Sequence, residues 1–220
     1  MNALFKIFLI FMFSPLVMFS QNIIEKPILF NDLRKELSLQ YMESRYGIKK
    51  DAPTIDPKLI VVHWTAIPSL QESFNTLYEP TLPGNRKDIQ EASPLNVSAH
   101  YLIDRNGQIY RLLPDTVFAR HVIGLNLSAI GIENVGGTSQ PLTKAQLAAN
   151  VELIKCLAEK YDIKYLIGHH EYTKFKGHPL WMEKDATYLT QKNDPGPEFM
   201  NKLRNELKDT GISGPPQAIE

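Results

Sequence analysis

The chain contains a single cysteine, Cys156, among its 220 residues. One thiol cannot form a disulfide within the chain, which excludes the cross-linked framework of many small secreted domains. Cys156 falls beside Leu153 and Leu157 on the apolar side of an expected helix, so we expect it to be a small core residue. The fold must therefore depend on a hydrophobic core, for which this length is sufficient.

Neither sign of charge is in excess: 24 Lys and Arg face 24 Asp and Glu, and the sequence pI is about 7.0. Such a chain has no long-range field to attract nucleic acid or an anionic lipid surface, so neither is expected as a partner. A polar ligand of mixed charge remains compatible with this balance. The sequence shows no internal repeat and no second domain, and we expect a monomer.

Apolar residues form long runs only near the N-terminus. Lys6 precedes the run 7–13, which Pro15 separates from a second short run at 16–19. This segment is too short and too interrupted to span a bilayer, and it has the layout of a secretory signal. We expect residues 1–20 to be removed near Ser20, although Met18 occupies a position that prefers a small residue. The mature protein is then expected in the periplasm or outside the cell, without stable membrane insertion.

The remaining chain alternates strand and helix patterns. Residues 21–57 predict an N-terminal helical extension, with Asn31 or Asp32 as its cap, and a proline-containing connector. The later elements are a buried strand at Leu59–Trp64, a helix at 69–78, a loop at 79–95, a hairpin of 97–103 and 108–113 around Asn106-Gly107, a strand at 129–135, a helix at 143–160, a strand at Tyr165–Gly168, an irregular loop at 171–192, a helix at 197–207 and a flexible tail at 209–220. This order predicts one α/β domain with a mixed central sheet flanked by helices.

Two histidines follow apolar strands, and an aspartate lies in a rigid turn. His63 ends the run Leu-Ile-Val-Val, His169 follows Leu-Ile-Gly, and Asp194 precedes Pro195. Ligands of open α/β sheets bind at the carboxyl ends of strands. Two imidazoles, one carboxylate and an open fourth position make a catalytic zinc site, so we expect these three residues to bind Zn²⁺.

Other ligand choices remain open on spacing alone. His170 points away from His169 if the strand period continues, which makes it the weaker candidate. His178 and Asp185 lie in the long irregular loop and are reserve ligands, and Asp185 competes with Asp194 for the third position. An isolated histidine is more commonly a hydrogen-bonded core residue than a metal ligand.

Five motifs, in this order, resemble those of the zinc-dependent N-acetylmuramoyl-L-alanine amidases. These enzymes share a fold with the peptidoglycan-recognition proteins and the phage lysozyme-type amidases. The motifs are Val-Val-His-Trp-Thr at 61–65, Ser-Ala-His-Tyr-Leu-Ile at 98–103, Ile-Gly-Ile-Glu at 130–133, Gly-His at 168–169 and Lys-Asn-Asp-Pro-Gly-Pro at 192–197. The resemblance covers roughly residues 59–207, so we expect a zinc amidase domain at 58–208.

The resemblance implies hydrolysis of the amide between N-acetylmuramic acid and L-alanine in peptidoglycan or muropeptides. It carries the zinc-ligand role to His63, His169 and Asp194. It makes Glu133 the general base and Lys192 the group that stabilises the tetrahedral oxyanion. Both roles suit amide hydrolysis, because water must lose a proton and charge develops on the carbonyl oxygen.

Three further residues are candidate substrate contacts. Trp64 follows His63 and can stack on a sugar, although it can equally pack in the protein. His121 lies where the family has a histidine near the substrate cleft. His100 sits in an alternating strand, where a structural hydrogen bond is as good an interpretation as contact with substrate.

Two other functions compete with the amidase hypothesis. The first is a peptidoglycan-binding protein of the same fold without catalysis, in which zinc ligands are lost. The second is a zinc peptidase that cuts within the stem peptide at the same metal site. The presence of all three ligand residues favours an enzyme, and the mass of the product would separate the two hydrolases.

Overall fold

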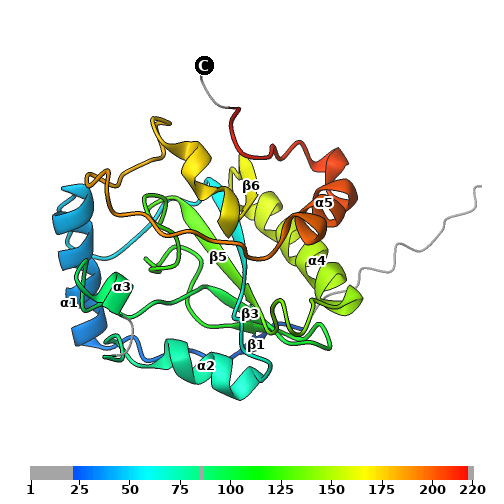
Figure 1. Ribbon diagram of the computed structural model, residues 1–220, viewed down its shortest axis with the longest axis horizontal. Helices are drawn as coiled ribbons and strands as arrows, with labels where there is room; N and C mark the ends of the chain where they lie inside the picture. Colours follow the sequence, from blue (N-terminus) through cyan, green and yellow to red (C-terminus); the bar gives the residue numbers. More distant parts are fainter. Residues whose placement is uncertain (1–21, 85–86, 218–220) are drawn as a thin grey trace, which may run out of the picture.

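A six-stranded mixed sheet forms the centre of the protein (Figure 1). This computed structural model describes residues 22–84 and 87–217, so the expected signal segment lies outside the described residues. The strand order is β1-β4-β3-β5-β2-β6; only β3 and β4 pair antiparallel, as the Asn-Gly hairpin predicts. The strands are β1 (Ile24–Glu25), β2 (Leu59–Trp64), β3 (Tyr101–Ile103), β4 (Ile109–Arg111), β5 (Ala129–Asn134) and β6 (Tyr165–Gly168).

Helices cover both faces and one end of this sheet (Figure 1). Among the described residues, no helix is long and apolar enough to cross a membrane. The α-helices are α1 (Asp32–Tyr41), α2 (Leu70–Tyr78), α3 (Lys87–Gln90), α4 (Lys144–Lys160) and α5 (Pro197–Glu206). A π-helical turn, Met42–Tyr46, extends α1, and 3₁₀ turns occupy His169–Phe175 and Lys208–Thr210.

Strand β2 lies between β5 and β6, and its first four side chains have no exposed surface. Ile60 and Val62 pack under α4 and α5, whereas Leu59 and Val61 face the segment 122–125 and the 3₁₀ turn that follows β6. Burial on both faces explains why this strand reads as a continuous apolar run rather than an alternating one. His63 is odd-numbered like Leu59 and Val61, so its side chain lies on the face away from α4 and α5.

Register brings the functional residues to one edge of the sheet. Strand β2 pairs in parallel with β5, with His63 opposite Glu133, and with β6, with Val62 opposite Gly168. Side chains of paired residues in parallel strands point to the same face, so His63 and Glu133 share a face. His169 follows the last paired residue of β6 directly, and all three therefore lie at the carboxyl edge.

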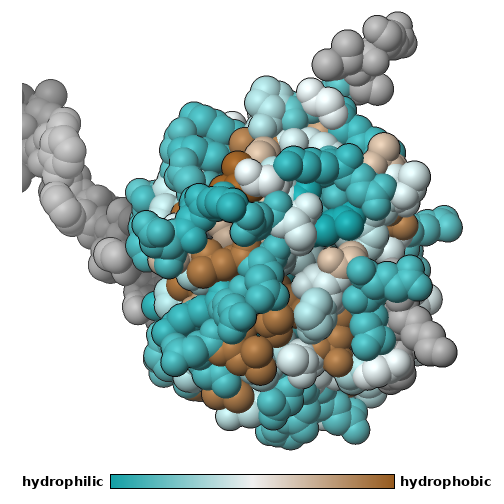
Figure 2. All heavy atoms as spheres, turned by 90° about the vertical axis from the view of Figure 1, so that its left-hand side faces the viewer, coloured by the Kyte–Doolittle hydropathy of each residue, from teal (hydrophilic) through white to brown (hydrophobic). Residues whose placement is uncertain are grey.

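The N-terminal extension joins the sheet through β1, which pairs with β4, whereas α1 packs on loop residues such as Leu95 and Phe118. Asn31 caps α1 through its side chain, as predicted, and the helix begins at Asp32. The buried Arg34 side chain donates to the carbonyls of Leu77 and Tyr78 at the end of α2, where a helix favours a cation. The side of the molecule that carries α1 is mostly hydrophilic, with apolar atoms between the polar side chains (Figure 2).

Two expectations about α4 and the tail are wrong. Cys156 is exposed, because it lies about 100° around the helix from Leu157 and beyond the edge of the buried stripe. The tail is not free throughout: Ser213 donates to the Lys164 carbonyl at 2.9 Å and accepts from the Leu166 amide at 2.8 Å. Residues 218–220 of the expected tail lie outside the described residues.

Candidate active site

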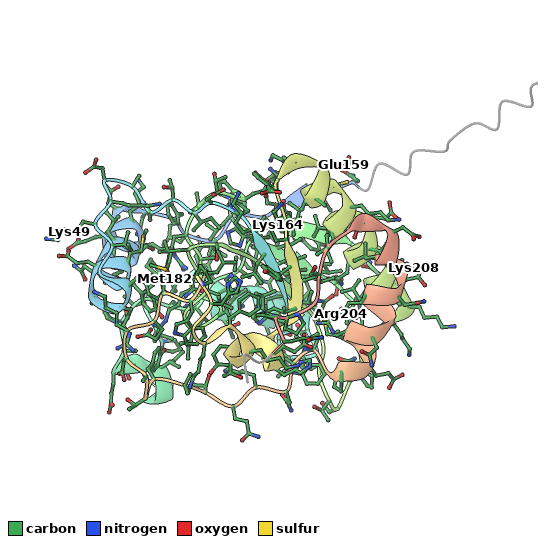
Figure 3. The ribbon with its side chains drawn as sticks, turned by 90° about the horizontal axis from the view of Figure 1, so that it is seen from above. Lys49, Glu159, Lys164, Met182, Arg204 and Lys208 are labelled. Atoms are coloured by element: carbon green, nitrogen blue, oxygen red, sulfur yellow. The ribbon has the colours of Figure 1, made fainter. Side chains whose placement is uncertain are left out.

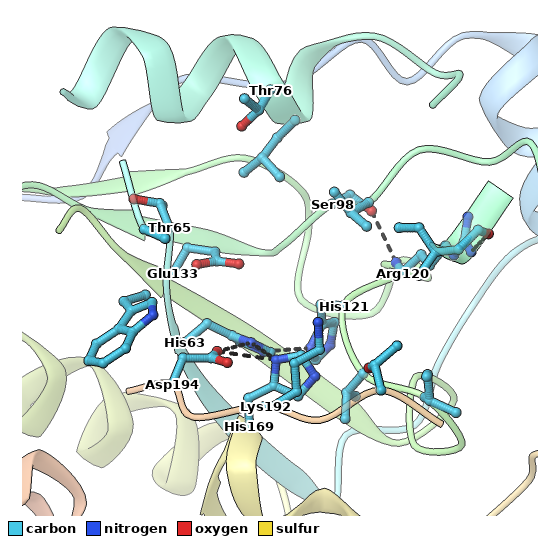
Figure 4. Close-up of a pocket in the computed structure, with 18 of the residues that line it drawn as sticks. His63, Thr65, Thr76, Ser98, Arg120, His121, Glu133, His169, Lys192 and Asp194 are labelled. Atoms are coloured by element: carbon cyan, nitrogen blue, oxygen red, sulfur yellow. Dashed lines mark hydrogen bonds and ion pairs between the residues drawn. The ribbon is translucent and has the colours of Figure 1, made fainter. Parts of the chain in front are cut away.

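Three ligand atoms converge where β2 and β6 end. His63 Nδ1 lies 3.0 Å from His169 Nδ1 and 3.2 Å from Asp194 Oδ2, and His169 Nδ1 lies 3.1 Å from the same oxygen. All three residues are buried, and Figure 4 shows their side chains meeting at the floor of a pocket. The three atoms form a nearly equilateral triangle.

The donor set and the triangle both fit Zn²⁺. Ligand atoms about 2.0–2.2 Å from a tetrahedral zinc lie roughly 3.4 Å from each other, close to the separations observed here. Two imidazole nitrogens and one carboxylate oxygen are the kind of three-residue ligand set that would leave a catalytic zinc one position for water or substrate. The sequence-predicted ligands His63, His169 and Asp194 are therefore the residues that the structure brings together as a candidate metal site.

Asp194 is held in place from its backbone. Both the amide and the ring Nδ1 of His170 lie 3.0 Å from the Asp194 carbonyl oxygen. His170 thus lies outside the ligand triangle, as its strand position predicts, and it fixes the turn that presents the carboxylate. The reserve candidates lie elsewhere: His178 contacts the Tyr165 hydroxyl, and Asp185 bonds to Thr187 and Arg45.

Electrostatics keep these groups in the protonation states that a metal requires. Burial and the neighbouring His63 lower the pKa of His169 to about 4, against the opposing effect of Asp194. Burial alone would raise the pKa of Asp194, but the two histidines outweigh it and hold this pKa well below its usual value. A neutral imidazole beside an ionised carboxylate is the form in which both bind Zn²⁺.

Glu133 and Lys192 line the same pocket, which has a cavity volume of about 410 Å³. The Glu133 carboxylate projects into it above His63, while Lys192 lies beside His169 and Asp194 (Figure 4). The site thus brings a carboxylate and an ammonium group into the pocket that contains the candidate metal ligands. That arrangement can accept a proton at one point and meet negative charge at another.

The three candidate substrate contacts have different placements. Trp64 lies at the pocket wall and is partly exposed. His121 borders the pocket but is buried, and its ring contacts His63.

His100 is fully buried and is not among the residues that line the pocket. Its Nε2 donates to the Val117 carbonyl, its Nδ1 accepts from the Gly131 amide, and burial lowers its pKa to about 4. The expectation that His100 contacts the substrate is therefore wrong, and the alternative prediction of a structural hydrogen bond is confirmed.

Several residues that support the site were missed by the sequence analysis, because their signals in the sequence are weak. Asn134 donates to the His63 carbonyl at 3.0 Å and accepts from Asn150 of α4 at 2.8 Å, which secures the end of β2. The Arg120 guanidinium donates to the carbonyls of Ser93 and Ile89 and thereby fixes the pocket wall. An asparagine on an apolar helix face was the only available sign of the first contact.

Comparison with known proteins identifies the family. The sequence profile of the N-acetylmuramoyl-L-alanine amidases (amidase 2) matches residues 53–197, well over half of the chain. The chain belongs to this family. The 1,6-anhydro-N-acetylmuramyl-L-alanine amidase AmpD of Haemophilus influenzae is 29% identical over 147 residues, which cover 59% of this chain and 78% of AmpD. Membership makes the chain an amidase-type hydrolase.

Solved structures show the same fold. The N-acetylmuramoyl-L-alanine amidase LysC from Clostridium intestinale superposes with a TM-score of 0.51 at 20% identity, over 87% of this chain and 99% of LysC. A selenomethionine derivative of AmpD gives 0.52 at 21% identity, over 85% of this chain and 94% of AmpD. The peptidoglycan-recognition amidase fold expected from the motifs is confirmed.

Proposed function

We propose that this family member hydrolyses the amide between the lactyl group of N-acetylmuramic acid and L-alanine, in peptidoglycan or muropeptides. The family profile and the likeness to AmpD, which is named for its anhydro-muramyl amidase activity, support this substrate class. The observation that carries the proposal is the buried triangle of His63, His169 and Asp194, which opens on a pocket shared with Glu133 and Lys192.

Zinc held by this triangle would polarise the scissile carbonyl and lower the pKa of a nearby water toward neutrality. The protein's own groups complete the chemistry. Glu133 accepts the proton of the attacking water and returns it to the leaving amine of L-alanine. Lys192 faces the carbonyl oxygen and stabilises the negative charge that develops there. The neutral amide in the ground state has little of this charge, so the lysine acts mainly on the transition state.

The complete ligand set argues against a binding protein without catalysis, because such a protein has no need for three converging ligand atoms. Cleavage within the stem peptide uses the same metal chemistry, so the products must separate this alternative from the amidase. We further propose that the protein is exported, because segment 1–20 has the layout of a secretory signal.

Metal content and products test the proposal together. Purified residues 21–220 should contain about one zinc per chain, as a single catalytic site requires. His63→Ala and His169→Ala should each abolish zinc binding and turnover. Lys202→Ala changes an exposed lysine that pairs with Glu198 on the surface of α5, and it serves as the control that retains zinc binding and turnover. Full zinc occupancy in the two histidine variants would overturn the site assignment.

A further inference from the structure

His121 makes a contact that a substrate-binding residue would not need. Its Nδ1 lies 3.0 Å from Nε2 of His63, and its own Nε2 lies 3.2 Å from the Ala129 carbonyl oxygen. The two rings meet nearly at right angles, with centroids 5.1 Å apart. His121 therefore connects a candidate metal ligand to the backbone of β5.

The Ala129 carbonyl determines which ring nitrogens of His121 and His63 carry a hydrogen. A carbonyl oxygen can only accept, so His121 Nε2 must carry a hydrogen. His121 Nδ1 and His63 Nε2 are in hydrogen-bond contact, so one of the two must donate, and a neutral His121 ring that carries its hydrogen on Nε2 offers only an acceptor at Nδ1. His121 Nδ1 thus accepts, His63 Nε2 donates, and His63 Nδ1 keeps its lone pair facing His169 and Asp194.

The surrounding residues hold the His121 ring in this position. A Cβ atom at Gly131 of β5 would lie 2.8 Å from the ring, so this strand position leaves space that the imidazole occupies. Asn126 accepts hydrogen bonds from the amides of His121 and Val122, each at 2.9 Å. Its side-chain amide in turn donates to the buried Tyr46 hydroxyl in the N-terminal extension, at 2.9 Å.

We propose that His121 is a positioning residue that holds His63 in the Nε2–H tautomer and so directs Nδ1 at the metal. This inference deepens the proposed function, on which it rests, since it takes Zn²⁺ as the ion bound by the triangle. Outer partners of this kind orient ligating imidazoles, and their loss typically weakens metal affinity about 10–100-fold. In this proposal His121 orients His63, whereas the sequence analysis expected it to contact the substrate.

An isosteric pair of variants isolates the hydrogen bond. In His121→Asn the side-chain oxygen takes the place of Nδ1 and can still accept from His63. The leucine side chain in His121→Leu has nearly the same shape as asparagine but offers no hydrogen-bond acceptor. His178→Leu removes a histidine that contacts Tyr165 outside the pocket and is the matched control.

The first readout needs no zinc. In the metal-free full-length mature protein, ¹⁵N spectra of the histidine rings should show His63 protonated at Nε2. In His121→Leu the hydrogen should shift toward Nδ1, because Asp194 Oδ2 lies within 3.2 Å as the remaining acceptor. His63 protonated at Nδ1 in the unmodified protein would overturn the inference, whether or not the variants fold.

The second readout is the zinc dissociation constant, measured by competition with a chromogenic chelator. His121→Leu should bind zinc about 10–100-fold more weakly, whereas His121→Asn and His178→Leu should remain near the parent value. Equal affinities of the Leu and Asn variants would contradict the inference while leaving the amidase proposal intact. An unmodified protein that binds no zinc would instead defeat the proposed function, and the tautomer spectrum would still decide the role of His121.

Discussion

His63 and Glu133 show which parts of the site a sequence can specify. Both lie next to the last residue of a β-strand that is buried on both faces, and such apolar runs have recognisable ends. Their pairing in register then follows from the parallel sheet. His100 and His121 could not be resolved in this way, because alternation assigns a side chain to a face but does not say what covers that face. His121 also lies in an irregular segment without any periodicity.

Replacement of Glu133 separates catalysis from metal binding. Glu133→Gln preserves the size of the side chain but cannot accept a proton, so turnover should fall roughly 10²–10⁴-fold. Zinc stoichiometry and melting temperature should stay unchanged, because Glu133 is outside the ligand triangle. Asp194→Ala is the contrasting variant and should lose zinc and turnover together. Near-normal turnover in Glu133→Gln would show that another group removes the proton.

His100 should make the protein acid-sensitive. Its pKa is about 4 in the folded protein against 6.5 for an ordinary histidine, so the unfolded chain binds a proton first. Above pH 6.5 His100 is neutral in both the folded and the unfolded state, and the free energy of unfolding is at its full value. As the pH falls toward 4, the unfolded chain takes up the proton first, and the free energy of unfolding falls by about 3 kcal/mol.

Denaturant titrations of the metal-free protein at several pH values measure this effect. His100→Gln should be less stable at neutral pH, since Gln can replace only one of the two hydrogen bonds. The difference in unfolding free energy between His100→Gln and the parent protein should narrow as the pH falls, because only the parent has the titrating imidazole at this position. A constant difference across this range would show that His100 does not titrate as described.

The contact between α1 and the loop after β6 was not predictable from local patterns. Arg45, in the π-helical turn that extends α1, forms an ion pair with the buried Glu183 at 2.8 Å, and its guanidinium lies over the Tyr188 ring. Met182 packs against the apolar cluster around Tyr41, at the end of the molecule that carries Lys49 (Figure 3). These partners are over 100 residues apart, so helix and loop signals could each be read while their packing could not.

Removal of Arg45 tests this contact. Arg45→Met keeps much of the side-chain volume but leaves the Glu183 carboxylate buried without its cation, which should cost about 3–5 kcal/mol of unfolding free energy. Lys35→Met provides the control, because its pair with Asp32 is exposed and should contribute less than about 1 kcal/mol. Both values can be measured by urea denaturation. Equal losses of unfolding free energy in the two variants would mean that the Arg45–Glu183 pair stabilises the protein no more than the exposed Lys35–Asp32 pair.

Export is a prediction about the whole molecule, and it rests on residues that lie outside the described ones. The proposal depends on Lys6 and the apolar run that follows it. Expression of the full chain with fractionation should recover a protein that lacks about the first 20 residues, outside the cytoplasm. N-terminal sequencing provides the measurement. Recovery of Met1 from a cytoplasmic pool would contradict export without affecting the amidase site.

The most direct test of the whole account is the mass of the products formed from one defined muropeptide. The metal-loaded protein should release an intact peptide that begins with L-alanine, together with the muramic acid sugar that retains its lactyl carboxylate. Treatment with a chelator should stop this release, and added zinc should restore it. Products cut between L-alanine and the next residue, or release that is unaffected by the chelator, would contradict the account.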